Sequence, residues 1–201
     1  MKIICLDLEG VLVPEIWIEV SKATGIPELQ RTTRDEPDYD KLMRFRLDIL
    51  KKNSLKLPDI QSVIGNMEPL TGAMEFCENI RKKTQLIILS DTFEEFAKPL
   101  MKKLKWPTLF CNSLEVAHNG DITGYRLRQQ EGKKHAVLAF KKLNMRVFAA
   151  GDSFNDIKML MEADEGCLFR PPENIRKEYS QFPCVDNYKD FMERIDAFLG
   201  N

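Results

Sequence analysis

Short apolar runs that alternate with helical patterns constrain the fold of this chain more than any other feature of its 201 residues. Five runs have the length of a fully buried strand: IICLDL, LIILSD, RVFAAGD, GCLFR and the weaker PCVDN. Apolar positions three and four apart predict helices over residues 72–83, 93–105, 133–143 and 155–163. This alternation predicts an α/β fold built on a doubly wound parallel sheet.

Two segments depart from the alternation. Residues 110–128 contain an Asn-Gly pair between two strand-like runs, which predicts a β-hairpin. Residues 14–70 contain three helical patterns and no strand, so we predict a small helical cap domain inserted after the first strand. The core domain would then comprise residues 1–13 and 71–201. Ligands of open parallel sheets bind outside the carboxyl ends of the strands, where such a cap would lie.

Composition argues against several classes of protein. The formal net charge of -1 provides no global attraction to nucleic acid or to a membrane surface. No apolar run approaches the roughly 20 residues that cross a bilayer, and no signal-peptide pattern is present. The five cysteines are widely spaced and form no C-x-x-C pair, which predicts free thiols in a reducing cytoplasm. We expect a cytoplasmic monomer or homodimer whose partner is a small molecule.

Polar residues follow three of the predicted strands. They are Asp7 and Glu9, then Ser90, Asp91 and Thr92, then Gly151, Asp152, Ser153, Asn155 and Asp156. Parallel strands would gather these residues at one edge of the sheet, and the basic pair Lys133 and Lys134 begins the helix before the third of these strands. Carboxylates from two strand ends can hold a hard cation such as Mg²⁺. A hydroxyl, backbone N–H groups and a lysine suit a phosphate.

These residues support attack by Asp7 on phosphorus, which would form an aspartyl-phosphate intermediate. A metal ion and a lysine would reduce the repulsion between the carboxylate and the phosphate dianion. Glu9, two residues further on, can protonate the leaving alkoxide and then deprotonate the incoming nucleophile. Gly10 would let the backbone turn close to the bound phosphate.

At these residues the chain resembles the haloacid dehalogenase (HAD) superfamily of phosphatases. DLEGV, ILSDT, a lysine that precedes a helix, and GDSFND match its four motifs in order. DLEGVLVPEIWI, PDYDKLM, ILSDTFEEF, YRLRQ and AAGDSFND further resemble the bifunctional phosphoserine phosphatase/homoserine phosphotransferase subgroup along nearly the whole chain. The resemblance implies a HAD-like, Rossmannoid fold with a helical cap. It also implies Mg²⁺-dependent hydrolysis of O-phospho-L-serine, with homoserine as a second acceptor.

The resemblance implies catalytic and metal-binding roles for four acids. Asp7 would be the nucleophile and Glu9 the acid/base. Mg²⁺ would be held by Asp7, by the backbone carbonyl of Glu9 and by Asp152, while Asp156 would orient the shell around the metal.

The resemblance also implies how the substrate is held. Ser90, Lys133 and the N–H of Asp91 would hold the phosphate, and Asn155 would lie at the substrate. From the cap, Glu15 would meet the substrate ammonium and Arg46 its carboxylate. Charge complementarity selects the same two groups, because an amino-acid phosphate carries one cation and one carboxylate.

Several of these residues also have an ordinary structural interpretation. Ser90 could cap the helix that follows its strand, and Asn155 and Asp156 could cap the helix after theirs. Lys134 is adjacent to Lys133, and a lysine on a helix is usually solvated. The matched pattern favours Lys133 as the phosphate ligand.

Two residues of the predicted cap also have an ordinary structural interpretation. Glu15 could be an acid favoured by the helix dipole, and Arg46 one cation on a solvated helix face.

Two features depart from the common superfamily pattern. Glu9 replaces the usual aspartate, and Asp91 and Thr92 replace the two glycines usual in phosphoserine phosphatases. Both departures fit the subgroup, although the carboxylate of Asp91 would repel phosphate unless it pointed away.

Two other functions compete with phosphoserine hydrolysis. A phosphatase for another small metabolite would accept phosphoserine poorly and would depend little on Arg46. A regulatory domain would accept phosphate on Asp7 and keep it, but Glu9 as an acid/base argues against that alternative. The chain contains neither G-x-x-x-x-G-K-[ST] nor G-x-G-x-x-G, which argues against a nucleotide-binding module.

Overall fold

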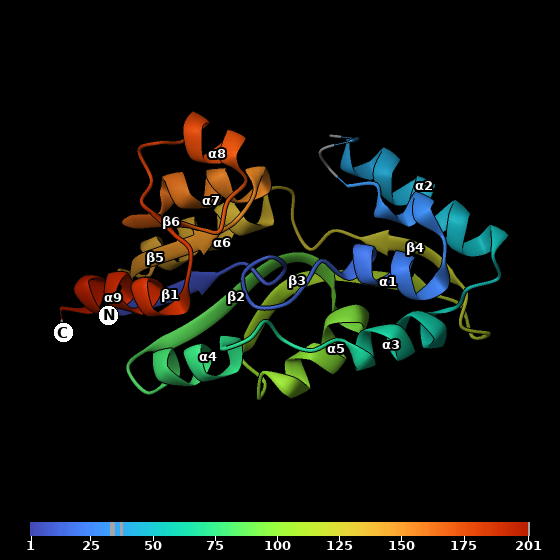
Figure 1. Cartoon of the computed structure of the whole chain (residues 1–201), viewed down its shortest axis with the longest axis horizontal. Coiled ribbons are helices and arrows are strands. Elements are labelled where there is room, and N and C mark those ends of the chain that lie inside the picture. Colours follow the sequence, from blue (N-terminus) through green and yellow to red (C-terminus); the bar gives the residue numbers. More distant parts are fainter. Residues whose placement is uncertain (33–34, 37, 201) are drawn as a thin grey trace.

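The computed structural model describes residues 1–32, 35–36 and 38–200, and these form a sheet between two layers of helices (Figure 1). Within these residues the sheet has seven strands in the order β4-β3-β2-β1-β5-β6-β7. All neighbouring strands are parallel except β3 and β4, which form the predicted hairpin. The strands are β1 (Lys2–Leu6), β2 (Gln85–Phe93), β3 (Thr108–Val116), β4 (Ile122–Arg126), β5 (Arg146–Gly151), β6 (Glu165–Phe169) and β7 (Cys184–Val185).

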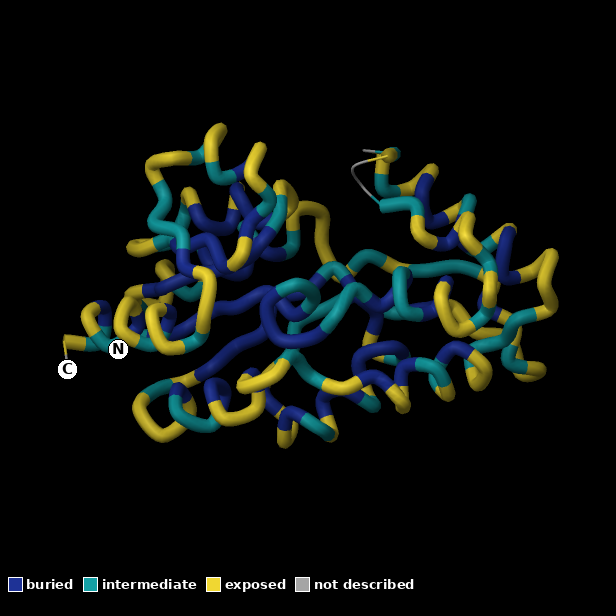
Figure 2. The backbone as a smooth tube through the Cα atoms, viewed as in Figure 1, coloured by how far each residue is buried: buried dark blue, intermediate teal, exposed yellow. Residues whose placement is uncertain are grey.

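Strand β1 occupies the centre of the sheet because both of its faces are apolar. Ile4 and Leu6 are fully buried on one face, and Ile3 and Cys5 on the other. Figure 2 shows the central strands of the sheet as mainly buried. The first face is covered by α4 (Ala73–Arg81), α5 (Glu94–Lys103) and α9 (Tyr188–Leu199), and the second by α6 (Gly132–Lys142), α7 (Ile157–Glu162) and α8 (Glu173–Glu178). The doubly wound α/β fold predicted from the sequence is therefore confirmed.

Helices α8 and α9 were not predicted, although α9 carries a clear sequence signal. The side chain of Asn187 accepts a hydrogen bond from the N–H of Asp190 and so caps the helix. Phe191, Ile195 and Phe198 then follow at helical spacing, and all three are buried. The helix covers the outer part of the sheet and contributes no residue to the pocket described below.

The segment 14–70 contains α1 (Ile16–Thr24), the 3₁₀ helix η1 (Pro27–Gln30), α2 (Tyr39–Lys52) and α3 (Leu57–Asn66). Helix α2 packs on β4, where the Tyr125 hydroxyl donates to Asp40 Oδ1 at 2.7 Å. The rings of Tyr39 and Tyr125 meet edge to face, with centroids 5.8 Å apart. The hairpin thus extends the sheet beneath these helices, and the boundary at residue 70 between a cap and a core stays a prediction.

Two further predictions concern composition. All five cysteines are free, as predicted, and Cys5, Cys77 and Cys167 are buried. Among the helices of the described residues, none combines the length and the apolar character needed to span a bilayer.

Candidate active site

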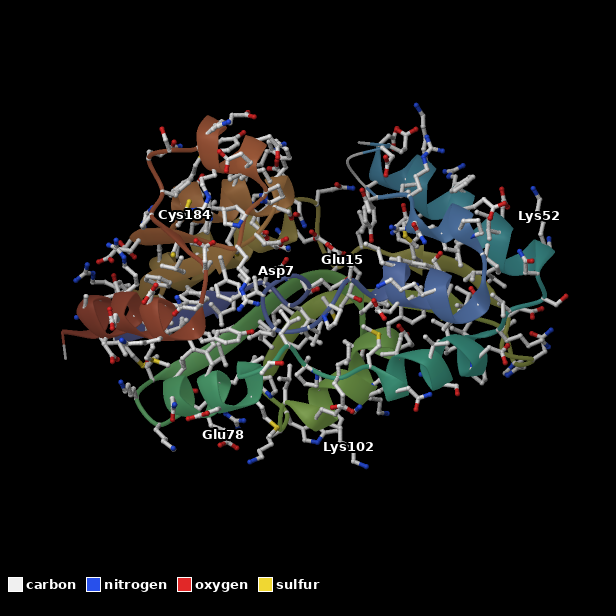
Figure 3. The ribbon with its side chains drawn as sticks, in the orientation of Figure 1. Asp7, Glu15, Lys52, Glu78, Lys102 and Cys184 are labelled. Atoms are coloured by element: carbon white, nitrogen blue, oxygen red, sulfur yellow. The ribbon has the colours of Figure 1, made fainter. Side chains whose placement is uncertain are left out.

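Three aspartates meet where β1 and β5 end. Asp7 follows β1 directly, and its N–H donates to Ala150 O of β5 at 2.9 Å. Asp152 follows β5, and Asp156 ends the short 3₁₀ helix η2 (Phe154–Asp156). All three side chains are buried, and each offers an oxygen within 4.8 Å of the other two. Parallel pairing therefore does bring these predicted carboxylates to one edge of the sheet, near the middle of the molecule (Figure 3).

Two glycines make room for this cluster. A Cβ on Gly10 would lie 2.5 Å from the Asp152 carboxylate, and Gly10 also has φ near +75°. A Cβ on Gly151 would overlap the side chain of Asp156. The sequence suggested that Gly10 clears space for a phosphate, whereas in the structure it lies against Asp152. Both glycines therefore allow the backbone to approach a buried carboxylate.

Lys133 connects the cluster to the neighbouring strand. Its Nζ lies 2.9 Å from Asp7 Oδ1, 2.7 Å from Asp156 Oδ1 and 3.5 Å from Asp91 Oδ2. Burial acts to lower the pKa of this lysine, but the three carboxylates outweigh burial and hold the pKa well above its usual value. The side chain of Lys133 is 5% exposed, whereas that of Lys134 is 29% exposed and faces other acids. Lys133 is thus the lysine that lies in this site.

The pKa of Asp7 is raised by its surroundings. Burial raises the pKa of Asp7 well above its usual value, and the nearby Asp156 raises it further. Lys133 acts in the opposite direction through an ion pair and a hydrogen bond, and the N–H of Leu8 donates to Asp7 Oδ1 at 2.7 Å. Several negative charges are crowded around Asp7, so the site favours the arrival of a cation.

Asp156 joins the turn after β5 to the buried lysine. Its Oδ2 accepts from the N–H groups of Asp152 and Ser153, both at 3.1 Å, which fixes the turn after β5. Its Oδ1 accepts from Lys133 at 2.7 Å. Asp156 precedes α7 but makes no side-chain cap hydrogen bond to it, so its side chain closes the turn before that helix and orients the buried lysine.

Ser90 lines the pocket beside these acids. Its Oγ accepts from the N–H of Thr92 at 3.2 Å, and the side chain is buried. Helix α5 begins only at Glu94, so Ser90 is not its N-cap. The alternative interpretation of Ser90 as a helix cap is therefore wrong.

Glu9 points toward the first helix of the segment 14–70. Its Oε2 accepts from the N–H of Ile16 at 2.9 Å. Burial raises the pKa of Glu9 to about 8, and the adjacent Glu15 carboxyl contributes in the same direction. A raised pKa favours the protonated form of Glu9, which is the form that can donate a proton to a leaving group.

A pocket of about 320 Å³ joins these groups. Every predicted site residue lines it except Asp156, which is fully buried. Residues that the sequence did not single out for the site also line it, among them Trp17, Thr32, Tyr39 and Arg170. Trp17 and Tyr39 lie within the subgroup motifs DLEGVLVPEIWI and PDYDKLM, whereas no motif quoted above contains Thr32 or Arg170.

Arg46 enters the pocket from α2 as a buried cation. Its guanidinium lies 4.6 Å from the Trp17 ring centroid, and its NH2 group donates to Arg31 O at 2.8 Å. Burial lowers the pKa of Arg46 to about 10, which leaves it charged. Its Nε is buried without a hydrogen-bond partner among the described residues. The alternative of a solvated Arg46 is therefore wrong, and one donor remains available to a ligand.

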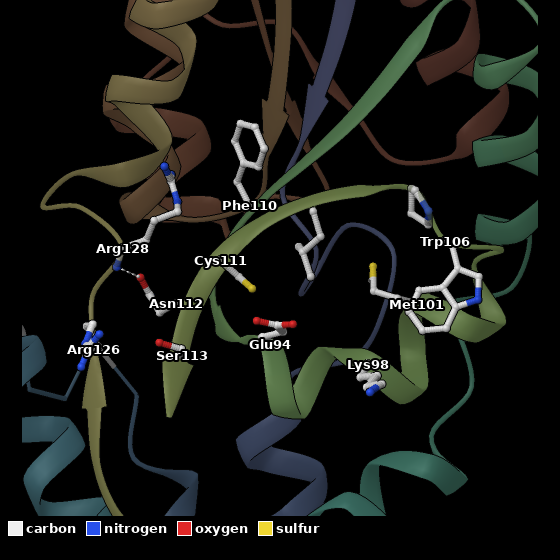
Figure 4. A pocket seen from close by; sticks show the side chains of 12 residues that line it. Glu94, Lys98, Met101, Trp106, Phe110, Cys111, Asn112, Ser113, Arg126 and Arg128 are labelled. Carbon is white, nitrogen blue, oxygen red and sulfur yellow. Dashed lines mark hydrogen bonds between the residues drawn. The ribbon is translucent and has the colours of Figure 1, made fainter. Parts of the chain in front are cut away.

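A larger cavity of about 610 Å³ lies between α5 and β3 (Figure 4). Glu94, Lys98, Met101 and Phe110 contribute to its lining, but neither Asp7 nor Lys133 does. Of these two, the smaller pocket is therefore the one that combines Asp7, a buried lysine and further carboxylates.

The site therefore has carboxylates at adjacent strand ends and a buried lysine beside them. Residues 15–161 match the model of the haloacid dehalogenase-like hydrolase family. The chain therefore belongs to this family, as the motifs predicted, and phosphatases of this family use a metal ion. The match begins after Asp7 and Glu9, so the assignment of these two residues rests on their geometry.

Two curated relatives show which enzymes of the family this chain is similar to. The chain is 55% identical to phosphoserine phosphatase ThrH of Pseudomonas aeruginosa over 190 residues, which cover 94% of this chain and 93% of ThrH. It is 53% identical to a phosphoserine phosphatase of Pseudomonas syringae pv. tomato, covering 94% and 80% of the two chains. The similarity to ThrH agrees with the subgroup that the sequence resembles.

Solved structures share the fold. A phospho-aspartyl intermediate analogue of phosphoserine phosphatase superposes with a TM-score of 0.79 at 19% identity, covering 96% of this chain and 98% of that one. A substrate-bound phosphoserine phosphatase complex gives 0.78 at 18% identity, covering 96% and 97%. At these identities the likeness establishes the HAD-like fold.

Proposed function

We propose that this chain is a Mg²⁺-dependent phosphoserine phosphatase that works through an aspartyl-phosphate on Asp7. The observation that carries the proposal is the ion pair between Lys133 and Asp7 in one pocket, because the proposed reaction needs a cation for the phosphate beside the nucleophile. The 55% identity to phosphoserine phosphatase ThrH over nearly all of both chains supports phosphoserine as the substrate.

The donor set at the sheet edge fits a hard cation. Asp7, Asp152 and Asp156 are three buried carboxylates, and one buried lysine leaves their charge only partly balanced. Mg²⁺ would be held by Asp7, Asp152 and the backbone carbonyl of Glu9. Asp156 already binds Lys133 and two backbone N–H groups, so we assign it to orienting the site. Bound Mg²⁺ would neutralise charge on the phosphate and on the nucleophile.

The residues support a balanced two-step reaction. A carboxylate oxygen of Asp7 attacks phosphorus while the bond from phosphorus to the serine oxygen breaks, and Glu9 gives that oxygen its proton. Water then attacks the phosphorus of the aspartyl-phosphate and loses a proton to Glu9. The acyl–phosphate bond breaks, Asp7 returns as a carboxylate and inorganic phosphate leaves. Lys133 and Ser90 would hold the phosphoryl oxygens in both steps.

The wall formed by α1 and α2 would recognise the amino acid. Glu15 would bind the ammonium group, and the free Nε of Arg46 provides a donor for the carboxylate. Asn155 and the N–H of Asp91 would complete the phosphate site. Homoserine carries the same two charged groups and a hydroxyl, so it would accept the phosphoryl group in place of water. We expect a cytoplasmic monomer or homodimer that binds neither nucleic acid nor membrane.

Phosphate release from O-phospho-L-serine is the first measurement. We expect release with Mg²⁺, none after chelation by EDTA, and recovery when Mg²⁺ is restored. Adding L-homoserine is expected to produce O-phosphohomoserine at the expense of inorganic phosphate, as detected by phosphorus NMR. Release from other small phosphates but not from phosphoserine would favour the alternative metabolite phosphatase. A stable aspartyl-phosphate without release would favour the regulatory domain.

Substitution of Arg46 tests the recognition of the substrate carboxylate. We expect Arg46→Ala to raise KM for phosphoserine by about 10- to 100-fold, the effect of losing a hydrogen bond between charged groups. Phosphoethanolamine lacks the carboxylate, so its KM should change little. Arg44→Ala is the matched control, because Arg44 is exposed on the same helix and pairs with Asp40. Equal effects of Arg46→Ala on both substrates would contradict the assignment.

A further inference from the structure

The carboxylate of Asp91 occupies a position that its sequence context did not favour. Its Oδ2 accepts from Asn155 Nδ2 at 2.9 Å and lies 3.5 Å from Lys133 Nζ. The sequence suggested that this carboxylate must point away from the phosphate site. In the structure it lies against two of the donors that the substrate phosphate would use. The side chain is 44% exposed and lines the pocket.

The backbone of Asp91 is held from two sides. Its carbonyl accepts from the Tyr39 hydroxyl at 3.1 Å and from Asn112 Nδ2 at 3.0 Å. The other end of the Asn112 amide accepts from the N–H of Arg128 at 3.0 Å (Figure 4). These contacts hold the main chain, whereas the side chain itself is 44% exposed to solvent. A ligand can therefore displace the carboxylate without moving the strand.

We propose that the Asp91 carboxylate is an internal competitor for phosphate at Lys133 and Asn155. This inference rests on the proposed function, since it takes these two side chains as phosphate ligands. An anion already held at the lysine must leave before a phosphate oxygen can take its place. Every compound that binds through a phosphate group therefore binds more weakly by the same factor. The product phosphate is released more readily as a result.

A purely structural role for Asp91 predicts the opposite change in phosphate affinity when its carboxylate is removed. If the carboxylate served only to orient Lys133 and Asn155, its removal would loosen both donors and weaken phosphate binding. If it competes with phosphate, its removal frees both donors and strengthens binding. The direction of the change in affinity therefore separates the two roles.

The experiment is a calorimetric titration of inorganic phosphate into Asp91→Asn and into the unsubstituted enzyme, both with Mg²⁺. Asparagine keeps the size of the side chain and removes its charge. We expect Kd for phosphate to fall about tenfold, the effect of one charge-assisted hydrogen bond reduced by solvent. KM for phosphoserine should fall by the same factor. Asp91→Ala, which removes both oxygens, should act in the same direction.

Asp48→Asn is the matched control, because it removes one aspartate charge from an exposed position of α2 outside the pocket. It is expected to leave Kd unchanged, which excludes a general effect of net charge. Unchanged or weaker phosphate binding in both Asp91 variants, with thermal unfolding as in the parent, would overturn the proposal. Failure of the parent enzyme to release phosphate from phosphoserine would instead count against the proposed function, and the phosphate titration does not depend on turnover.

Discussion

Asp7→Asn is expected to lower kcat for phosphoserine at least about 10⁴-fold, because an amide cannot form the covalent phosphoryl intermediate. Asparagine has nearly the same shape, so the strand end and the N–H contact of Leu8 should persist. Steady-state phosphate release gives the loss of rate. Rapid acid quench with ³²P-labelled phosphoserine should trap labelled protein in the parent enzyme and none in the variant.

The loss of kcat in Asp7→Asn should not come from unfolding of the protein. The carboxylates of Asp7, Asp152 and Asp156 crowd one another in the metal-free protein, and a neutral amide relieves that repulsion. We therefore expect metal-free Asp7→Asn to unfold at the same temperature as the parent or higher, as is common at functional sites. Residual activity above about 1% of the parent rate would assign the nucleophile to another residue.

Lys133→Met is expected to lower the free energy of unfolding by about 3–5 kcal/mol, because it leaves buried carboxylates without their cation. Methionine keeps the length of the side chain and removes its charge. The same substitution should abolish phosphate release, since Asp7 and the substrate phosphate would then repel each other without the lysine. Chemical denaturation monitored by tryptophan fluorescence measures the loss of stability.

Lys134→Met is the matched control for this experiment. Lys134 lies 3.7 Å from Glu131 and 3.8 Å from Glu162 at the surface, so its removal should change stability by less than about 0.5 kcal/mol. Combining Lys133→Met with Asp156→Asn should recover part of the stability, because the second change removes one unpaired buried charge. A larger effect at Lys134 than at Lys133 would reverse the choice between the two lysines.

The sequence predicts the carboxylate site well because parallel strands have a fixed polarity. Once β1 and β5 are recognised as buried strands, Asp7 and Asp152 must lie at the same edge of the sheet. The spacing of GDSFND then returns Asp156 to the start of its own turn, where it accepts from the N–H of Asp152. These relations depend on chain direction and short spacing, which a sequence contains.

Other features depend on how distant segments pack. The adjacent lysines 133 and 134 are indistinguishable by spacing, and their separation follows from which face of α6 turns inward. The contact of Trp17 with Arg46 joins two helices of the segment 14–70. The direction of the Asp91 side chain is set by Asn155, 64 positions later in the chain. No local pattern encodes such contacts.

The central place of β1 has a consequence for synthesis of the protein on the ribosome. β1 is made before both of its neighbours, β2 and β5, which begin only at residues 85 and 146. At the usual rate of translation, on the order of ten seconds separates β1 from its second neighbour. During that interval an apolar strand edge is unpaired, which favours capture by chaperones or aggregation. Asp7 can meet Asp156 only after residue 156 has been made, so shorter nascent chains lack the complete cluster of three carboxylates.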